Sequence, residues 1–483
     1  MWDGTNMLAL ATGLLYVTSV IAVALRIIWR RPATSVALAW LLLLAAFPLV
    51  GVFIYLMVGE TWLSTRRTRR TAAVAPRLLR SIAVLRDQFG VSMRDGHPGS
   101  VGTDAIGVGT GFLPTLGGNR VEILDGAWAS ISRLIEDIDN ARESCQLLFY
   151  IWEPGGIVDQ VEGALVRAQE RGVSCRVMVD AVGGKPLLGP AGDRLRDAGI
   201  EVRASLPVGR LRTLLSRVDL RNHRKLVAID GSVGYTGSLN MADPALFKQD
   251  AGVGQWVDVM ARVEGPSAGL LSALFELDWS LECKEAADPN QWVPKEIVRA
   301  GPSCVQVVPS GPGQNPKALY RMLLAAIHSA QDHLVMTTPY LVPDEAFMEA
   351  LATAAQRGVK TEMVVPAKID GRLVGLATHA NCEDLLRVGV RVWAYRGGLL
   401  HAKTITVDHE LAIVGTVNLD RRSFWLNYEL SLVLHGGTAV DELARVQRGY
   451  IDDSDPIEDT SWGERGRARK LAESGASLFA PLL

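Results

Sequence analysis

Two stretches of this sequence carry the same chemically active side chains at the same spacing. In the first stretch these residues are His223, Lys225, Asp230, Gly237, Ser238 and Asn240, and in the second they are His401, Lys403, Asp408, Gly415, Thr416 and Asn418. Both stretches obey the pattern H-x-K-x4-D-x6-G-[ST]-x-N without a gap. A single H-x-K is frequent on solvated strands, but six positions repeated at identical spacing indicate one site that is built twice.

The side chains of this pattern suit the chemistry of a phosphodiester. One imidazole nitrogen can attack phosphorus while a second group protonates the leaving oxygen. Ammonium and amide groups stabilise the negative charge on the non-bridging oxygens. Because the lysines supply positive charge, we expect phosphoryl transfer that requires neither a metal ion nor a cofactor.

A β-hairpin in each copy is expected to position these side chains. A His and a Lys two residues apart project from the same face of a strand. The apolar run after each Lys continues that strand into a turn at Asp230 or Asp408, and the next run returns as its neighbour. The glycine of the pattern allows the backbones to approach closely. We expect the two aspartates to hold local structure at the strand ends.

The pattern lies inside a larger internal duplication. The first half contains "LLFYIWEPGGIVDQVEGALVRAQERGVSCRVMVDAVG", and the second contains "LVMTTPYLVPDEAFMEALATAAQRGVKTEMVVPAKID". Each reads as a strand, a turn with Pro154 or Pro343, an amphipathic helix that stops at Arg-Gly-Val, and a second strand. Such units favour parallel, right-handed crossovers. The sequence therefore predicts an α/β fold of two α/β/α lobes packed face to face, with the chemistry at their seam.

The first sixty residues predict a hairpin of two transmembrane helices. Neither Gly4 to Leu25 nor Pro32 to Gly59 contains a charge, and each run is long enough to cross a hydrocarbon core of about 30 Å. Three arginines lie between the runs and six lie within residues 66–80. The larger cluster places residues 61–483 in the cytoplasm, with the short turn outside. The missing basic start argues against a cleaved signal peptide.

Charge is distributed unevenly along the 483 residues. Residues 1–80 hold nine arginines and two acids, a net of +7, so the rest carries about −9 of the total of −2. The arginines of residues 66–80, which we call the collar, are expected to contact anionic lipid headgroups. The five cysteines lack any metal or disulfide spacing, which fits a reducing compartment.

With these motifs the sequence resembles the phospholipase D superfamily, and in particular the bacterial cardiolipin synthases with two N-terminal transmembrane helices. The resemblance covers nearly the whole chain and includes "YIWEPGG", "DLRNHRK", "YTGSLNMADP", "AGVGQWVD", "GGLLHAK" and "GTVNLDRRSFWLNYE". It implies transmembrane helices at 1–62, the collar and a Gly-rich connector at 63–118, and phospholipase D-like lobes at 119–300 and 301–483. It also implies the bacterial inner membrane as the location.

The resemblance implies a two-step transfer between two molecules of phosphatidylglycerol. One histidine, which we assign as His223, forms a phosphatidyl-histidine, and the other, His401, protonates the leaving glycerol and then activates the second lipid. The near symmetry of the repeat leaves this order open. The residues implied to bind phosphate oxygens, with the two hydroxyls assisting, are Lys225, Lys403, Asn240, Asn418, Ser238 and Thr416.

Further residues have two readings each. Asp258 and Glu429 fall in corresponding places, where they either fix the tautomer of an imidazole or lie at the surface. The arginines beside the motifs either recognise headgroup phosphate, which the anionic substrate favours, or are solvated charges; they are Arg221, Arg224, Arg421 and Arg422. The other histidines, His97, His328, His333, His379, His409 and His435, are expected at the surface or in turns. The C-terminal tail is either an interfacial helix or a packed one.

Other functions compete with a synthase. A lipid hydrolase shares the first half-reaction, and a synthase can use phosphatidylethanolamine as one of its donors. A nuclease requires a basic groove, which the acidic catalytic region and the predicted membrane anchor oppose, so no nucleic acid is expected. A non-catalytic scaffold is disfavoured because both His–Lys pairs are kept. A homo-oligomer stays open.

Overall fold

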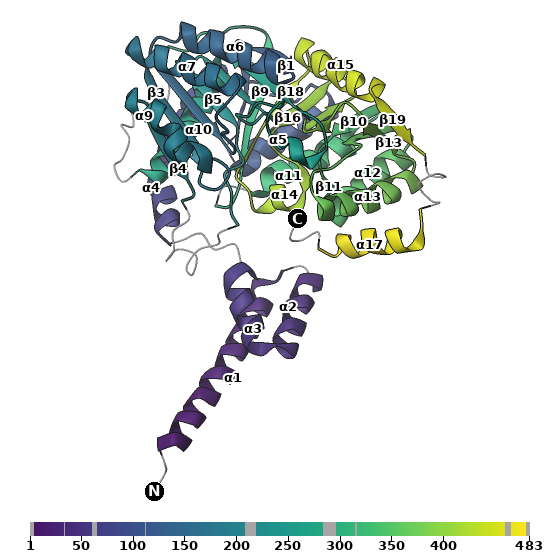
Figure 1. Ribbon diagram of the computed structural model, residues 1–483. Coiled ribbons are helices and arrows are strands. Elements are labelled where there is room, and N and C mark those ends of the chain that lie inside the picture. Colours follow the sequence, from purple (N-terminus) through teal and green to yellow (C-terminus); the bar gives the residue numbers. More distant parts are fainter. Residues whose placement is uncertain are drawn as a thin grey trace. The chain divides into compact units, whose positions relative to one another are not determined.

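The computed structural model describes residues 4–32, 34–59, 65–111, 113–207, 219–283, 296–313, 316–458 and 465–479. The chain forms two compact units (Figure 1). The N-terminal unit comprises Met1–Arg66 with Val208–Asp219, and the second comprises Arg67–Pro207 with Leu220–Leu483. The last four residues of the C-terminal tail lie outside the described residues.

The N-terminal unit contains one helix that is long and apolar enough to cross a membrane, within the described part of the chain. This helix, α1 (Gly4–Arg30), has 27 residues, which corresponds to a length of about 40 Å. The second apolar run does not form one helix. It divides into α2 (Thr34–Ala46), α3 (Pro48–Ile54) and the short π-helix η1 (Tyr55–Gly59), so the expected second span is wrong as a continuous helix.

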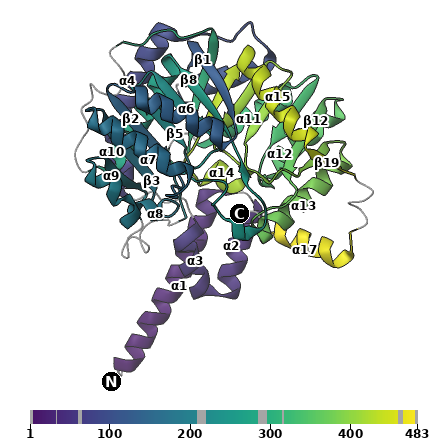
Figure 2. The same cartoon turned by 45° about the horizontal axis from the view of Figure 1, so that its top comes forward.

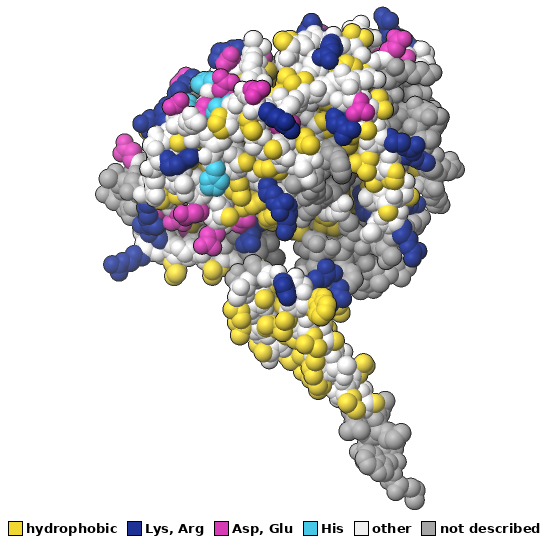
Figure 3. Space-filling model, turned by 180° about the vertical axis from the view of Figure 1, so that it is seen from behind, with side chains coloured by type: hydrophobic (Ala, Val, Ile, Leu, Met, Phe, Trp, Pro, Cys, Tyr) yellow, Lys and Arg dark blue, Asp and Glu magenta, His cyan; other side chains and the backbone are white. Residues whose placement is uncertain are grey.

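The second apolar run instead folds back on itself at Phe47. The rings of Trp40 and Tyr55 pack edge to face with their centroids 5.2 Å apart, whereas 15 residues of continuous helix separate side chains by more than 20 Å. Pro48 cannot donate an intrahelical hydrogen bond and begins the second arm. A Cβ on Gly51 would lie only 3.1 Å from Leu44 Cα, so glycine allows the arms to touch. Figures 1 and 2 show α2 and α3 side by side, and Figure 3 shows their apolar surface.

Two helices precede the sheet of the second unit. Helix α4 (Thr65–Phe89) contains the whole collar, and α5 (Pro98–Gly111) lies in the segment that we expected to be a connector. Helix α5 packs against α11 (Pro316–Ser329). A Cβ on Gly107 would meet the Gln306 side chain, so the glycines allow close packing of a helix rather than an irregular linker.

One sheet of 15 strands runs through both lobes, in the order β19-β13-β12-β10-β15-β16-β18-β9-β1-β8-β6-β5-β2-β3-β4. The first lobe supplies β1 (Thr115–Asp125), β2 (Ser144–Phe149), β3 (Ser174–Asp180), β4 (Glu201–Ser205), β5 (Leu226–Ile229), β6 (Val233–Gly237) and β8 (Val259–Glu264). The second supplies β9 (Ser303–Ser310), β10 (His333–Thr337), β12 (Lys360–Pro366), β13 (Arg391–Tyr395), β15 (Thr404–Val407), β16 (Leu411–Gly415), β18 (Glu429–His435) and β19 (Ser454–Ile457). The lobes meet where β1 pairs with β9, antiparallel.

The duplication is visible in the topology. Strands β2, β3 and β4 are parallel, as are β10, β12 and β13. Helices α7 (Ile157–Glu170) and α12 (Glu345–Gln356) make the first crossover of each lobe. The predicted hairpins are β5–β6 and β15–β16, both antiparallel. Two phospholipase D-like α/β lobes, expected from the repeat, are therefore confirmed.

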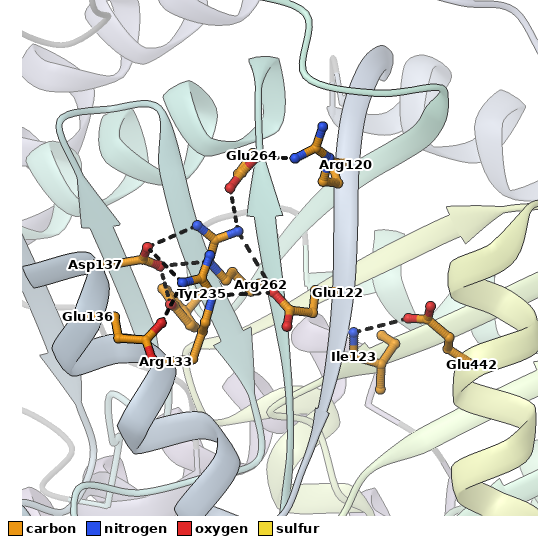
Figure 4. Close-up of polar contacts among 10 residues, drawn as sticks. All are labelled: Arg120, Glu122, Ile123, Arg133, Glu136, Asp137, Tyr235, Arg262, Glu264 and Glu442. Atoms are coloured by element: carbon orange, nitrogen blue, oxygen red, sulfur yellow. Dashed lines mark hydrogen bonds and ion pairs between the residues drawn. The ribbon is translucent and has the colours of Figure 1, made fainter. Parts of the chain in front are cut away.

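Helices cover both faces of the sheet. Helices α10 (Pro266–Glu282) and α15 (Thr438–Asp452) share one core cluster with strands of both lobes. Helix α6 (Ala127–Asn140) packs with α7 in a separate cluster, and α11 packs with α12 in a third. Asp137 of α6 accepts hydrogen bonds from Arg262 of β8 and Tyr235 of β6, which fastens α6 to the sheet (Figure 4).

The described part of the C-terminal tail forms α17 (Arg467–Ser477). It packs on α13 (Arg372–Arg387), and its buried Glu473 pairs with Arg465 at 2.7 Å. We expected the tail to form either an interfacial helix or a packed one, and its described part forms the packed helix. Leu471 on this helix and Leu478 directly after it nevertheless remain exposed.

Candidate active site

Both copies of the pattern line a single cavity in the second unit. Its volume is about 780 Å³, and both lobes contribute to its walls. The predicted residues that line it are His223, His401, Asn240 and Asn418. The seam of the duplicated fold therefore brings the two histidines to one site, as the sequence predicted.

The His–Lys segments lie just ahead of the hairpin strands, not on them as we expected. Strand β5 begins at Leu226 and β15 begins at Thr404. The reason is that the backbone of each histidine pairs with the other lobe. The His223 N–H donates to the Tyr428 carbonyl at 2.9 Å, and the His401 N–H donates to the Val257 carbonyl at 2.8 Å. The backbone of each histidine thus bonds to the opposite lobe, and the hairpin strand of its own lobe begins only after the lysine.

Each imidazole is bonded to a carboxylate of the opposite lobe. His223 Nδ1 lies 2.9 Å from Glu429 Oε2, and His401 Nδ1 lies 2.6 Å from Asp258 Oδ1. Glu429 is 0% exposed and Asp258 is 2% exposed, so the alternative of a surface role is wrong. The two lobes exchange these carboxylates, so neither lobe alone contains both members of either pair.

The hydroxyls of the pattern hold these carboxylates. Ser238 Oγ donates to Asp258 Oδ1 at 2.6 Å, and Thr416 Oγ1 donates to Glu429 Oε2. Both hydroxyls are fully buried, and neither residue lines the cavity. Their contacts therefore do not favour the expected role in phosphate binding. They position the carboxylates instead.

A close backbone contact explains why the pattern has glycine at its seventh position after the aspartate. A Cβ on Gly237 would lie 2.3 Å from the Val259 carbonyl oxygen, and one on Gly415 would lie 2.4 Å from the Leu430 carbonyl oxygen. These oxygens belong to the residues directly after the two carboxylates. The close backbone approach expected for glycine is therefore the contact that carries Asp258 and Glu429 to the site.

The protonation of the site follows from burial and charge. Burial lowers the pKa of His223 to about 4, against the opposite effect of Glu429. Burial likewise lowers the pKa of His401 to about 4, with Lys403 adding to the effect and Asp258 opposing it. Burial opposes ionisation of the two carboxyls, but their partner histidines hold the pKa of Asp258 and of Glu429 below the usual range.

A consistent tautomer results. An ionised carboxylate only accepts hydrogen bonds, so Nδ1 of each neutral imidazole carries the proton. The Nε2 lone pair is then available as a nucleophile or a base. Both histidines have this arrangement, so the site can offer one attacking nitrogen and one proton-transferring nitrogen.

The lysines supply positive charge from buried positions. Lys225 Nζ donates to the His223 carbonyl at 2.9 Å, and Lys403 Nζ donates to the His401 carbonyl at 2.5 Å. Burial lowers the pKa of Lys225 to about 8 and that of Lys403 to about 7. An anion in the cavity favours the charged form of both.

Asp230 and Asp408 have structural contacts. Asp230 accepts three backbone N–H groups at 2.8–2.9 Å, from residues 142–144. Asp408 accepts the three from residues 331–333, all at 2.8 Å. His97 Nε2 also lies 3.0 Å from Asp408 Oδ2. Neither aspartate lines the cavity.

The flanking arginines divide into two pairs. Arg221 and Arg422 line the cavity, as expected for headgroup recognition. Arg224 is fully buried and paired with Asp278 at 2.7 Å. Neither Arg224 nor Arg421 is among the residues that line the cavity, so their contacts do not favour the expected role.

Sequence reasoning missed several groups of the cavity. The Tyr150 ring lies 4.9 Å from the His223 ring, and the Trp256 ring lies 4.3 Å from the His401 ring. Asn427 also lines the cavity and donates to Glu429. Trp256 and Asn427 each precede a carboxylate by two residues, and that equal spacing was a usable signal. The described residues contain no group of three or more acidic, His or Cys side chains that could hold a metal ion.

Comparison with known proteins shows the family to which the chain belongs. The family described as "Cardiolipin synthase, PLD-like domain" matches residues 134–279 and 323–448, and a phospholipase D-nuclease N-terminal family matches residues 19–60. Two similar proteins are cardiolipin synthase A of Edwardsiella ictaluri, 40% identical over 96% of both chains, and that of Erwinia tasmaniensis, 40% identical over 95% of this chain and 96% of the other. The chain belongs to the cardiolipin synthase family. It is accordingly a phosphatidyltransferase of the phospholipase D superfamily, which confirms the resemblance.

A solved structure supports the fold separately. Phosphatidylserine synthase of Haemophilus influenzae superposes with a TM-score of 0.58 at 15% identity, covering 79% of this chain and 97% of that one. At this identity the likeness shows the fold alone. Membership of the family and the apolar helix α1 also indicate that this is a membrane protein.

Proposed function

We propose that His223 and His401 share one phosphatidyl transfer, with His223 as the nucleophile. The observation that carries this is the exchanged pair of His–carboxylate bonds, which leaves both Nε2 atoms unprotonated at one cavity. Attack of His223 Nε2 on the phosphorus of phosphatidylglycerol forms an N–P bond and breaks the bond to the glycerol oxygen. His401 donates a proton to that oxygen, and glycerol leaves.

In the second step His401 takes a proton from a hydroxyl of the second phosphatidylglycerol. The alkoxide attacks phosphorus, the N–P bond breaks, and cardiolipin forms. A negative phosphodiester beside His401 raises its pKa above the value in the free site, which favours the protonated form required of an acid.

Other residues stabilise the phosphate charge. Asn240 and Asn418 line the cavity and supply donors to the non-bridging oxygens. Lys225 and Lys403 do not line it, but each is bonded to the carbonyl of its histidine and adds positive charge beside the site. Arg221 and Arg422 are placed to bind a second phosphate, because they line the same cavity. Two lipid phosphates must be present together in the second step.

The deciding experiment uses the purified full chain in phosphatidylglycerol vesicles. Cardiolipin and glycerol should appear in equal amounts. Phosphatidic acid without cardiolipin would instead establish the alternative, a lipid hydrolase. Adding phosphatidylethanolamine and measuring ethanolamine release tests that lipid as a donor.

The lengths of the N-terminal helices bear on how the chain is oriented in the membrane. We propose that α1 crosses the inner membrane once and that α2 and α3 form a re-entrant hairpin, because their arms are too short to cross individually. Arg26, Arg30 and Arg31 then lie on the same side as the collar, the arrangement that the positive-inside rule favours. The catalytic unit remains cytoplasmic, but the start of α1 lies outside.

Labelling tests this topology. A cysteine introduced at Thr5 should react with an impermeant maleimide added to intact spheroplasts, and one introduced at exposed Ser474 should not. Protection of the Thr5 site together with the Ser474 site would restore the transmembrane hairpin that we first expected.

A further inference from the structure

Arg67 lies against the segment that carries the carboxylate partner of His223. Its Nη1 atom pairs with Glu282 at 2.5 Å, and both side chains are largely buried, at 13% and 9% exposed. Its Nε donates to the Tyr428 hydroxyl at 3.3 Å, and its guanidinium lies 5.2 Å from the centre of the Tyr428 ring. These contacts differ from those of a headgroup-binding collar residue, because they point into the protein.

Tyr428 links this arginine to the reacting groups. It precedes Glu429 in sequence, its carbonyl accepts the His223 N–H at 2.9 Å, and its N–H donates to the Arg221 carbonyl at 2.9 Å. Its side chain is almost completely buried. The backbone of this one residue therefore fixes the separation between His223 and Glu429.

A second arginine also contacts Tyr428 and Glu429. Arg224 lies 5.6 Å from the centre of the Tyr428 ring, and its Nε donates to the Glu429 carbonyl at 3.0 Å. Two cations held against one aromatic ring restrict its motion. Arg224 is itself held by Asp278, one helical turn before Glu282 on α10.

The opposite pair lacks this device. The residue that corresponds to Tyr428 is Val257, which precedes Asp258. An aliphatic side chain offers neither a hydroxyl nor a ring, so an arginine cannot hold His401 and Asp258 through this position. The two halves of the site are thus distinguished by a contact outside the repeated pattern.

We propose that Arg67 is a positioning residue that acts through Tyr428 to hold Glu429 against His223. This inference deepens the proposed function, because it rests on the role given there to the His223–Glu429 pair. Arg67 is also the residue at which the chain enters the catalytic unit from the N-terminal unit. The start of the catalytic unit is therefore bonded to the residue that precedes Glu429.

The test is steady-state kinetics of the full chain in phosphatidylglycerol vesicles. Arg67→Ala should lower kcat roughly 10- to 100-fold, the scale expected from a small misplacement of a reacting group, and leave KM within about twofold. Tyr428→Phe, which keeps the ring and backbone, should lower kcat in the same direction, and Arg67→Lys should restore part of the loss. Arg70→Ala is the matched control, because Arg70 lies on the same helix and bonds the Leu281 carbonyl of α10 but not Tyr428.

A double-mutant cycle separates positioning from general stability. In a Glu429→Gln background, Arg67→Ala should cost less than about threefold more, because the group it positions is already lost. A full additional loss would overturn the proposal, as would a rise in KM shared by Arg67→Ala and Arg70→Ala, which indicates headgroup binding. If Glu429→Gln alone leaves kcat unchanged, the proposed function fails, and that outcome is distinct from a failure of Arg67.

Discussion

The change Glu429→Gln isolates the charge that the structure places behind His223. The glutamine has the same shape, and its oxygen can still accept from His223 Nδ1 and from the Thr416 hydroxyl. Its amide replaces the oxygen that accepts from Asn427, so only the Asn427 amide has to turn over. What disappears is a negative charge next to an imidazole that becomes positive as the N–P bond forms. Two unit charges about 4 Å apart interact by about 4 kcal/mol at an effective dielectric constant of about 20.

That energy corresponds to a loss of about 10³-fold in rate. The assay is glycerol release from phosphatidylglycerol vesicles, with kcat and KM measured separately. A matched control exists in Glu362→Gln, because Glu362 is a buried carboxylate 2.7 Å from His333 Nε2 and does not line the cavity. A folded Glu429→Gln protein that keeps more than about a tenth of the wild-type kcat refutes the reasoning.

Three further changes test other parts of the site. Since the pKa of Lys403 is about 7, kcat/KM should fall as the pH rises through 7, and Lys403→Arg, which stays protonated, should move this alkaline limb upward; an unmoved limb assigns it to another group. Asp408→Ala leaves three backbone N–H groups without their acceptor and should cost about 3 kcal/mol of stability, seen in thermal unfolding; an unchanged midpoint contradicts the structural role. Gly415→Ala places a Cβ 2.4 Å from the Leu430 carbonyl oxygen and should abolish glycerol release, whereas full activity shows that this contact does not position Glu429.

Local chemistry in the sequence predicted the repeated unit well. The hairpins, the parallel crossovers and the convergence of the two histidines follow from periodicity and from a pattern that occurs twice. The turn aspartates also behaved as expected, because a carboxylate directly after a strand finds backbone N–H groups within reach. The hairpins and the crossovers depend on residues that are close together in the chain, whereas the two aspartates bond to backbone N–H groups 75–88 residues away.

Contacts between distant segments were less accessible. No spacing indicated that Glu429 serves His223 and Asp258 serves His401, because the exchange depends on how the lobes meet. The burial of Arg67 is a similar case, since an arginine in a basic run gives no sign of a partner 361 residues away. The break at Phe47 had a visible cause in Pro48, but the uncharged run suggested one helix by length alone.

The central claim is that His223 forms the covalent intermediate, and direct detection of that intermediate tests it best. The full chain with His401→Ala, incubated with labelled phosphatidylglycerol, quenched and digested, should yield a phosphatidyl adduct on the peptide that contains His223. The His223→Ala protein should yield none. An adduct on His401 in the His223→Ala protein, with none on His223 in the other, would contradict the account and reverse the two roles.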